Sequence, residues 1–267
     1  MSRTIRPTAL PSATALAVAL TLLASPLPAQ ESVEAQLDWG ERHRVTAPVA
    51  GIVRQVETRV GTHVEAGTPL FRLDTRRVDA DLRAAEAAVQ RLELELAEAD
   101  READKAQDLY DQTLIAAREL ELARIEQATV AARLTEAQAR RDRARADRDD
   151  ATVRAPAHGR ITRLHVRTGE YVNPALVPPV LAELGTTDPM RATALVPVSA
   201  LANLAVGQGA TVVIDGTRHS GEVAALGWEP TGEEADRGYR VEVSFSPGDG
   251  NGLRPGQPAR IEFDHRN

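Results

Sequence analysis

The sequence predicts an elongated, modular α+β fold. In it, an antiparallel α-helical coiled-coil hairpin is inserted into a β-sandwich, and a small β-barrel follows. Three observations lead to this prediction. Residues 75–150 contain neither glycine nor proline. The segments on either side of them share a repeat at a constant offset. After Gly185, short apolar runs alternate with clusters of glycine, proline and aspartate, a pattern typical of small barrels.

The first 29 residues have the pattern of a cleavable secretory signal. Arg3 and Arg6 form a positive start, Ala13 to Ala24 is apolar, and Leu27-Pro28-Ala29 offers a small residue for cleavage. The apolar run is shorter than the roughly 20 residues that span a bilayer, although a retained N-terminal anchor is the alternative. The chain has no cysteine, so disulfides and thiolate metal sites are excluded. We therefore expect a periplasmic protein.

A polar lead-in at residues 30–44 is expected to contribute one strand to a later module. Residues 45–74 then alternate Val, Ile and Leu with polar residues and predict four short strands. The turns that follow Ala50 and Val60 are expected to need glycine, at Gly51 and Gly61, for a positive φ.

Residues 75–151 are predicted to form the hairpin. In the first arm, apolar or small residues follow an unbroken 4-3-4-3 spacing, the a/d seam of a coiled coil: Val78, Leu82, Ala85, Val89, Leu92, Leu96, Ala99, Ala103, Ala106 and Tyr110. The second arm carries a weaker seam, which Gln127 and Arg141 interrupt: Ala116, Leu120, Ala123, Val130, Leu134, Ala137 and Ala144. An arm of about 36 residues would project roughly 50–55 Å.

Two features mark the base of the hairpin. Asp74 is placed to cap the N-terminus of the first helix with its carboxylate. Five arginines crowd the end of the second helix, where cations suit the helix dipole: Arg140, Arg141, Arg143, Arg145 and Arg148. A solvated helix face explains them better than the alternative, a contact with lipid headgroups.

The second half of the sandwich is predicted at residues 152–185. Its Val, Pro and Gly residues repeat those of the first half 108 positions later, as from Val45 to Val153 and from Gly61 to Gly169. Isolated hairpins are only marginally stable, so neither half can bury a core alone. The two halves are therefore expected to form one sandwich that carries the hairpin.

Residues 186–267 are predicted to form the barrel from five or six short strands. We expect strands at Arg191–Val196, Ala210–Ile214, His219–Leu226, Tyr239–Phe245 and Ala259–Phe263. A short helical connector over residues 197–204 is expected to be capped by Ser199, and the segments at 231–238 and 246–252 are expected to be exposed loops.

Several short motifs of this sequence resemble those of periplasmic adaptors, the membrane fusion proteins of the HlyD and RND-pump type. The resemblance rests on Ala47-Pro48 with Gly51, Arg154-Ala155-Pro156 with Gly159, and Leu253-Arg254-Pro255-Gly256-Gln257, in that order around a hairpin. It implies a lipoyl-like barrel-sandwich hybrid in the middle of the molecule. It also implies a periplasmic adaptor of a tripartite efflux or secretion system, bridging an inner-membrane RND or ABC transporter to an outer-membrane TolC-type duct.

The resemblance also implies side-by-side assembly, as a trimer or hexamer, and docking through the hairpin tip. In duct-binding members the tip carries Arg, then Leu four residues on, then Ser seven further. Lys105, Leu109 and Ala116 stand there in this chain, so Lys replaces Arg and the serine is missing. Only residues 264–267 follow the expected barrel, so the family's membrane-proximal domain is expected to be absent or vestigial. The residues expected to contact the duct are Lys105, Leu109, Leu114, Ile115, Ala116 and Glu121.

No catalytic, cofactor or metal site is predicted. The six histidines are scattered without ligand spacing, and neither a Gly-x-Ser-x-Gly motif nor a phosphate-binding glycine loop occurs. The net charge of −7 argues against binding to nucleic acid. The alternative function is a non-transport scaffold of the cell envelope that uses its coiled coil only to self-associate.

Overall fold

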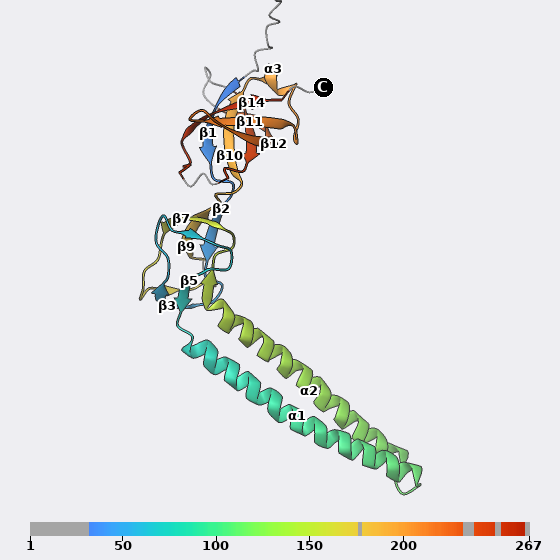
Figure 1. Ribbon diagram of the computed structural model, residues 1–267. Coiled ribbons are helices and arrows are strands. Elements are labelled where there is room, and N and C mark those ends of the chain that lie inside the picture. Colours follow the sequence, from blue (N-terminus) through green and yellow to red (C-terminus); the bar gives the residue numbers. More distant parts are fainter. Residues whose placement is uncertain (1–31, 176–177, 232–237, 249–251, 265–267) are drawn as a thin grey trace, which may run out of the picture.

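The computed structural model describes residues 32–175, 178–231, 238–248 and 252–264. The molecule is elongated, with a β-barrel at one end, a β-sandwich in the middle and a helical hairpin at the other end (Figure 1). This arrangement confirms the predicted fold class. The sandwich begins with β2 (Arg42–Thr46), so it reaches further toward the N-terminus than the expected boundary at residue 45.

The sandwich consists of two four-stranded antiparallel sheets, in the orders β2-β9-β7-β4 and β6-β5-β3-β8. The first half of the repeat supplies β3 (Gly51–Val56), β4 (His63–Val64) and β5 (Pro69–Leu73). The second half supplies β6 (Thr152–Arg154), β7 (Gly159–Leu164), β8 (Tyr171–Val172) and β9 (Val180–Gly185). Each sheet takes strands from both halves, so neither half is complete without the other.

The internal repeat is a structural two-fold relation, because equivalent hydrogen bonds occur twice. The Gly61 N–H donates to the Ile161 carbonyl at 2.8 Å. The counterpart of Gly61, Gly169, donates to the Val53 carbonyl, also at 2.8 Å. The strand pair β3–β8 mirrors the pair β7–β4 in the same way. The two halves therefore exchange strands around a common axis.

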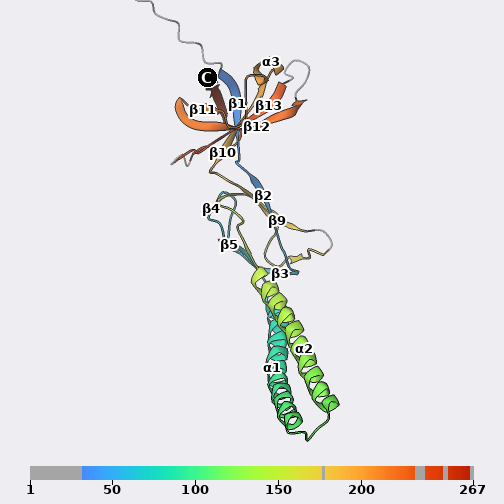
Figure 2. The same ribbon diagram turned by 90° about the vertical axis from the view of Figure 1, so that its right-hand side faces the viewer.

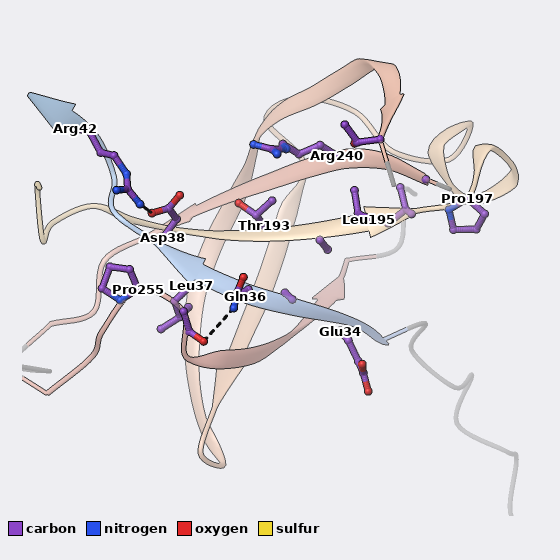
Figure 3. A pocket seen from close by; sticks show the side chains of 16 residues that line it. Glu34, Gln36, Leu37, Asp38, Arg42, Thr193, Leu195, Pro197, Arg240 and Pro255 are labelled. Atoms are coloured by element: carbon purple, nitrogen blue, oxygen red, sulfur yellow. Dashed lines mark hydrogen bonds and ion pairs between the residues drawn. The ribbon is translucent and has the colours of Figure 1, made fainter. Parts of the chain in front are cut away.

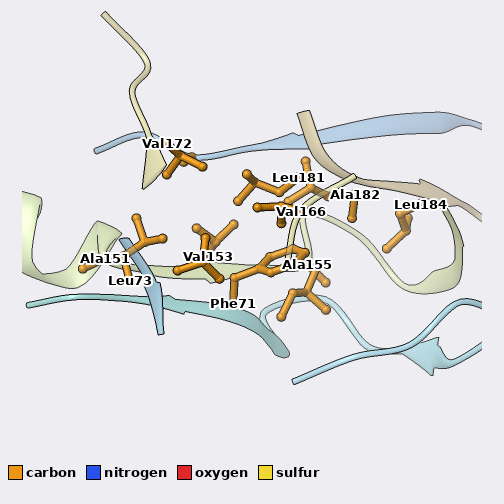
Figure 4. Close-up of a cluster of buried hydrophobic side chains, with 14 of the residues drawn as sticks. Phe71, Leu73, Ala151, Val153, Ala155, Val166, Val172, Leu181, Ala182 and Leu184 are labelled. Atoms are coloured by element: carbon orange, nitrogen blue, oxygen red, sulfur yellow. The ribbon is translucent and has the colours of Figure 1, made fainter. Parts of the chain in front are cut away.

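One apolar core joins the two sheets. Figure 4 shows Phe71 and Val153 from one sheet facing Leu181 and Val166 from the other side of the sandwich. Phe71, Leu70, Val53 and Leu181 are completely buried. The shared core explains why residues more than 100 positions apart fold as one unit.

Two long helices leave the sandwich side by side (Figures 1 and 2). Helix α1 (Arg76–Asp111) has 36 residues and α2 (Ala117–Asp150) has 34. At 1.5 Å per residue α1 is about 54 Å long. The predicted seam is buried or half-buried from Val78 to Ala106 and from Leu120 to Ala144. Val89, Leu92 and Ala137 pack together between the helices, whereas Val78 joins the core of the sandwich. Tyr110 and Ala116 are exceptions, because they are exposed where the helices end.

Polar contacts fix the antiparallel register of the helices. The Gln127 amide donates to Asp100 at 2.8 Å, and Arg148 lies 3.6 Å from Asp79 near the base. Gln127, one of the two interruptions of the predicted seam, thus still faces the partner helix. Of the five arginines near the base, Arg140, Arg141, Arg145 and Arg148 form ion pairs with carboxylates of the hairpin, in line with a solvated helix face.

The predicted position of the N-cap of α1, Asp74, is wrong by one residue. Thr75 is the N-cap of α1, and its side chain makes no capping hydrogen bond. Asp74, one position earlier, accepts the Arg76 backbone N–H at 3.0 Å and pairs with the guanidinium groups of Arg76 at 2.7 Å and Arg54 at 2.5 Å. The hydrogen bonds from Arg76, followed by that from Arg54, hold the pKa of Asp74 well below its usual range. Asp74 therefore ties the base of α1 to strand β3.

Low pH should weaken the bonds that Asp74 makes with Arg76 and Arg54. Because the folded-state pKa of Asp74 is depressed, its contribution to stability is complete above the unfolded value of about 3.9 and is lost as the pH falls toward the folded value. We expect Asp74→Asn to lower the melting temperature at pH 7, and the difference from the wild type to shrink below about pH 4. Thermal unfolding from pH 7 to pH 2 measures this; a difference that is constant with pH would contradict it.

The glycine prediction is right at one turn and wrong at the other. Gly61 has φ +89°, as expected. Gly51 does not have a positive φ in the structure. A Cβ on Gly51 would instead lie 3.3 Å from the Leu73 Cβ, so close packing of β3 against β5 is what favours glycine there.

The barrel closes through six strands in the order β1-β10-β13-β12-β11-β14. They are β1 (Ser32–Asp38), β10 (Met190–Val196), β11 (Gly209–Ile214), β12 (Thr217–Thr231), β13 (Gly238–Phe245) and β14 (Pro258–Phe263). The lead-in therefore supplies the expected strand, β1. Val212, Val241, Val243 and Ile261 are completely buried in the centre.

The helical connector of the barrel is shorter than expected. Helix α3 (Val198–Leu201) starts after Pro197, which is its N-cap in an extended conformation, so Ser199 lies inside the helix and does not cap it. Of the two expected loops, residues 232–237 and 249–251 lie outside the described residues.

Two paired chain segments connect the barrel to the sandwich. Gly40 donates to the Thr186 carbonyl at 3.2 Å, and Thr186 donates back to the Glu41 carbonyl at 2.9 Å. The Trp39 ring lies against Gly185, where a Cβ would approach the ring to 2.3 Å. The fluorescence of Trp39 should therefore respond to changes at the junction of barrel and sandwich.

Candidate docking site at the hairpin tip

A Schellman turn ends α1 at the tip. Leu114 donates its N–H to the Leu109 carbonyl at 2.9 Å, and Thr113 donates to the Tyr110 carbonyl at 2.8 Å, the two bonds that define this motif. Thr113 takes the left-handed conformation, with φ +62°. The turn reverses the chain within five residues, 112–116, before α2 begins.

Thr113→Gly should stabilise the tip. A side chain in the left-handed region costs about 1–2 kcal/mol, and glycine avoids this cost while losing part of the gain to greater chain entropy. We expect the free energy needed to open the turn to rise by about 1 kcal/mol. This should appear as roughly fivefold slower hydrogen exchange of the backbone amides in the turn around residue 113. Thr113→Ala keeps a Cβ at this φ and is the control. Equal exchange in both variants would contradict the explanation.

The six residues predicted to contact the duct lie at or near this turn, in different surroundings. Leu114 is 65% exposed, whereas Leu109 and Ile115 are half-buried. Ala116 is the exposed N-cap of α2. The remaining two are on the helices: Lys105 lies on α1, 3.6 Å from Glu102, and Glu121 lies on α2. The structure therefore places an apolar turn between two charged helix flanks.

Sequence reasoning missed two exposed apolar residues of α2. Leu122 is 54% exposed and Ile125 is 53% exposed, on the side of α2 that faces away from the seam. Both fall outside the 4-3-4-3 pattern, and their own spacing of three residues on a helix was the signal that could have found them. They extend the apolar surface of the tip along α2.

Charge is divided along the hairpin. The distal part, residues 93–126, contains eleven Asp or Glu and four Arg or Lys. The basal part, residues 76–92 and 127–150, contains eight acidic and ten basic residues. The acidic character of the whole chain, with a net charge of −7, thus resides in the distal half of the hairpin.

A groove lies on the outer surface of the barrel. This groove, of about 1190 Å³, runs where β1 and β10 diverge, between Glu34, Thr193, Leu195 and Arg240 (Figure 3). The strands pair only from Ala35 opposite Ala194 onward, which leaves the groove open beyond that point. Its side chains carry both charges, so they do not select one class of ligand.

Among residues 32–175, 178–231, 238–248 and 252–264, no three His, Asp or Glu side chains gather in a way that could hold a metal ion. None of the helices in the same part of the chain combines the length and apolar character needed to cross a membrane.

Comparison with protein families decides the relationship. The model described as "CzcB-like, barrel-sandwich hybrid domain" matches residues 41–177, slightly more than half of the chain. The chain belongs to this CzcB-like family. The match covers the inserted hairpin and every strand of the sandwich except β9 (Val180–Gly185), and it confirms the resemblance to membrane fusion proteins.

Solved structures of membrane fusion proteins share the fold. The membrane fusion protein Spr0693 from Streptococcus pneumoniae R6 superposes with a TM-score of 0.66 at 15% identity, covering 88% of this chain and 99% of that one. A MacA–MexA chimera with the Pseudomonas aeruginosa MexA α-hairpin gives 0.63 at 17% identity, covering 88% and 78%. MacA from Actinobacillus actinomycetemcomitans gives 0.59 at 17%, covering 88% and 79%. At these low sequence identities, the similarity is evidence for a shared fold alone.

Proposed function

We propose that this CzcB-like protein is a periplasmic adaptor of a tripartite efflux system, joining an inner-membrane RND or ABC transporter to an outer-membrane TolC-type duct. The observation that carries the proposal is the hairpin, about 54 Å long, which ends in an exposed apolar turn instead of returning to a core. An exposed apolar turn far from the body of a protein is an interaction surface.

The tip residues have distinct roles in this proposal. Leu109, Leu114 and Ile115 supply apolar contact to helices of the duct, and the small Ala116 allows close helix packing. Lys105 and Glu121 border the contact with opposite charges. The chain supplies geometry and a seal, while the transporter supplies energy and selects the cargo; we assign no enzymatic step to the adaptor.

The proposal places the mature chain in the periplasm after removal of a signal within residues 1–29. There it would be held at the inner membrane by the transporter. Three or six copies would stand side by side in the complex, with the sandwich and the barrel against neighbouring copies and the transporter. The junction supports this arrangement of the barrel and the sandwich, because two hydrogen-bonded chain segments connect these two modules.

Co-purification tests this function. The tagged full chain, crosslinked in its native cells and extracted in detergent, should retain one inner-membrane transporter and one outer-membrane duct. A chain whose tip, residues 105–121, is replaced by a glycine–serine loop should retain only the transporter. Deletion of the gene should sensitise the cells to exported compounds. Self-association without either partner, and no change in sensitivity, would instead establish the envelope scaffold.

A further inference from the structure

An open cavity lies at the base of the hairpin, where α2 meets the sheet β6-β5-β3-β8. Its volume of about 800 Å³ is within the range of small-molecule sites, roughly 300–1,000 Å³. Four arginines line it: Arg54 of β3, Arg72 of β5, Arg154 of β6 and Arg148 of α2. Among the described residues, Asp149 is the one carboxylate in the lining. We call this space the basal cavity.

Strand pairing gathers three of these arginines on the outer face of the sheet. Arg72 lies opposite Thr152 of β6, and Arg154 follows two residues later on the same face. On the other side of Arg72, its partner in β3 is Gln55, the residue next to Arg54. Strand β3 has a register shift at this point, and Arg54 and Gln55 are both exposed. The three guanidinium groups therefore come from neighbouring strands.

Two of the guanidinium groups are held at one position and keep most of their donors. Arg72 donates its Nε–H to Glu57. Arg154 donates one terminal N–H to the Gly67 carbonyl at 3.0 Å. In the part of the chain that the structure describes, neither group makes a further hydrogen bond, and no carboxylate lies within 4.0 Å of Arg154. Both terminal nitrogens of Arg72, and one of Arg154, can therefore donate to a ligand.

The other two guanidinium groups are also fixed by carboxylates. Arg54 donates Nε–H and one terminal N–H to Asp74, at 3.0 and 2.5 Å. Arg148 has its Nε 3.6 Å from Asp79 and its Nη1 3.2 Å from Asp149. Such anchoring fixes the direction of each guanidinium group and reduces the entropy that is lost when an anion binds. The basal cavity is thus preorganised, with donors from the sheet on one side and from α2 on the other.

The fold of the sandwich does not require these arginines. The repeat positions equivalent to the three arginines of the sheet hold two threonines, Thr46 and Thr162, and one carboxylate, Glu183. Glu183 lies opposite Arg163, just as Arg72 lies opposite the equivalent residue of β3. The two halves share one architecture, yet only one of the two related faces is rich in arginine. A binding role accounts for this difference, whereas the fold does not.

The distribution of charge along the molecule also favours an anion at the base. Residues 42–74 and 152–185, which form the sandwich, contain nine Arg and five Asp or Glu. The basal part of the hairpin likewise has more basic than acidic residues, whereas the distal part is acidic. An anion is therefore attracted to the sandwich and repelled by the distal hairpin.

We propose that the basal cavity binds a soluble anion that carries two or more phosphate groups. The guanidinium groups approach from three strands and from a helix, so they do not lie in one plane. A tetrahedral phosphate offers oxygens in several directions, whereas the two oxygens of a carboxylate lie in one plane. The cavity lies in the middle of the elongated molecule, with the sandwich between it and the barrel (Figure 1), which favours a soluble anion over a lipid headgroup.

The bound anion connects the hairpin to the sandwich. Arg148 belongs to the last turn of α2, and Ala151 alone separates α2 from β6. An anion held by Arg148 together with Arg72 or Arg154 therefore joins this end of α2 to the sheet. Asp74 makes the corresponding connection for α1. The site does not depend on the adaptor function, because it uses residues of the sandwich and of α2 alone.

Isothermal titration calorimetry tests the binding. Pyrophosphate, orthophosphate and citrate are titrated separately into the full chain, in a buffer without phosphate. We expect pyrophosphate to bind at least about tenfold more tightly than either of the other two, and its affinity to fall with added salt. Citrate is the control for charge, because it is a multivalent anion without tetrahedral groups.

Matched variants locate the site. Arg148→Gln and Arg154→Gln should each weaken pyrophosphate binding at least about tenfold. Arg143→Gln and Arg163→Gln remove the same charge from α2 and from the sandwich but lie outside the lining, so they should leave the affinity within about twofold. Arg154→Lys keeps the charge without the planar fork and should give an intermediate affinity. Circular dichroism confirms that each variant is folded.

Hydrogen exchange tests the connection between α2 and the sheet. Saturating pyrophosphate should slow the exchange of the backbone amides of residues 146–152 in the wild type, but not in the variant that combines Arg148→Gln with Arg154→Gln. Binding that leaves this exchange unchanged would contradict the connection.

Three results would overturn the binding site: equal affinity for the three anions, equal weakening by Arg143→Gln or Arg163→Gln, or binding to lipid alone. The last is measured with vesicles of phosphatidylcholine and cardiolipin, a lipid with two phosphates. If these vesicles bind through Arg148 and Arg154 and free pyrophosphate does not compete, the ligand is a lipid headgroup. The titration contains neither transporter nor duct, so its failure would leave the adaptor function standing.

Discussion

Replacing Leu114 with glutamate is expected to abolish export while the protein stays folded. The Leu114 side chain is 65% exposed, so the charge meets water in the free adaptor. In a packed contact with the duct the same carboxylate would lose its hydration without gaining a partner, at a cost of several kcal/mol. The backbone bonds of the Schellman turn do not need the leucine side chain. Cells with Leu114→Glu should be as sensitive to exported compounds as the deletion strain.

The control for Leu114→Glu is Leu94→Glu, which makes the same change at a leucine of α1 that is 75% exposed and distant from the turn in sequence. Leu94→Glu should leave export intact. Immunoblots check protein levels and circular dichroism checks helix content. Leu109→Glu should also abolish export, but Leu109 is half-buried, so a loss of folding must be excluded there first. Normal export by Leu114→Glu at normal protein levels would refute the assignment of the tip.

Replacing Phe71 with alanine is expected to unfold the sandwich at moderate urea concentrations. Phe71 is completely buried between the sheets, and removing such a ring costs about 3–5 kcal/mol. A domain with about 5–15 kcal/mol of stability loses a large share of it. Because both halves of the repeat contribute to this core, the two should unfold together, and the base of the hairpin should lose its support.

Trp39 makes this effect measurable. Trp228, the other tryptophan, is 95% exposed, and in a Trp228→Phe background Trp39 alone reports on the junction beside the sandwich. We expect Phe71→Ala to lower the urea midpoint of the Trp39 fluorescence change. Phe263→Ala, at a half-buried ring of the barrel, should lower it less. Equal shifts in the two variants would mean that the sandwich is not the separate cooperative unit that its core suggests.

The repeat and the first arm of the hairpin could be predicted well because each rests on a strict local pattern. The offset that relates Gly61 to Gly169 reappears as paired hydrogen bonds of equal length. The spacing of Val89 and Leu92 reappears as burial between the helices, against Ala137 of α2. Periodicity of side chains maps directly onto the faces of helices and strands, so such patterns survive folding.

The ends of elements could not be predicted to the residue. Thr75 is the N-cap of α1 without a capping side-chain bond, while Asp74, one position earlier, accepts the Arg76 N–H. Pro197 starts α3 and displaces Ser199 from its expected role. Gly51 is explained by its approach to Leu73, a contact across two strands. Competing local hydrogen bonds differ by small energies, so tertiary packing selects among them.

The exposed apolar surface of the hairpin was predicted only in part, for a related reason. The spacing of apolar residues along the chain was enough to establish a hairpin set between the halves of one sandwich, because periodic burial is encoded residue by residue. Which apolar side chains remain outside depends on how α1 and α2 rotate against each other. That rotation buried Leu120 and left Leu122 and Ile125 exposed. Exposure is a property of the assembled pair of helices, and only the tertiary structure decides it.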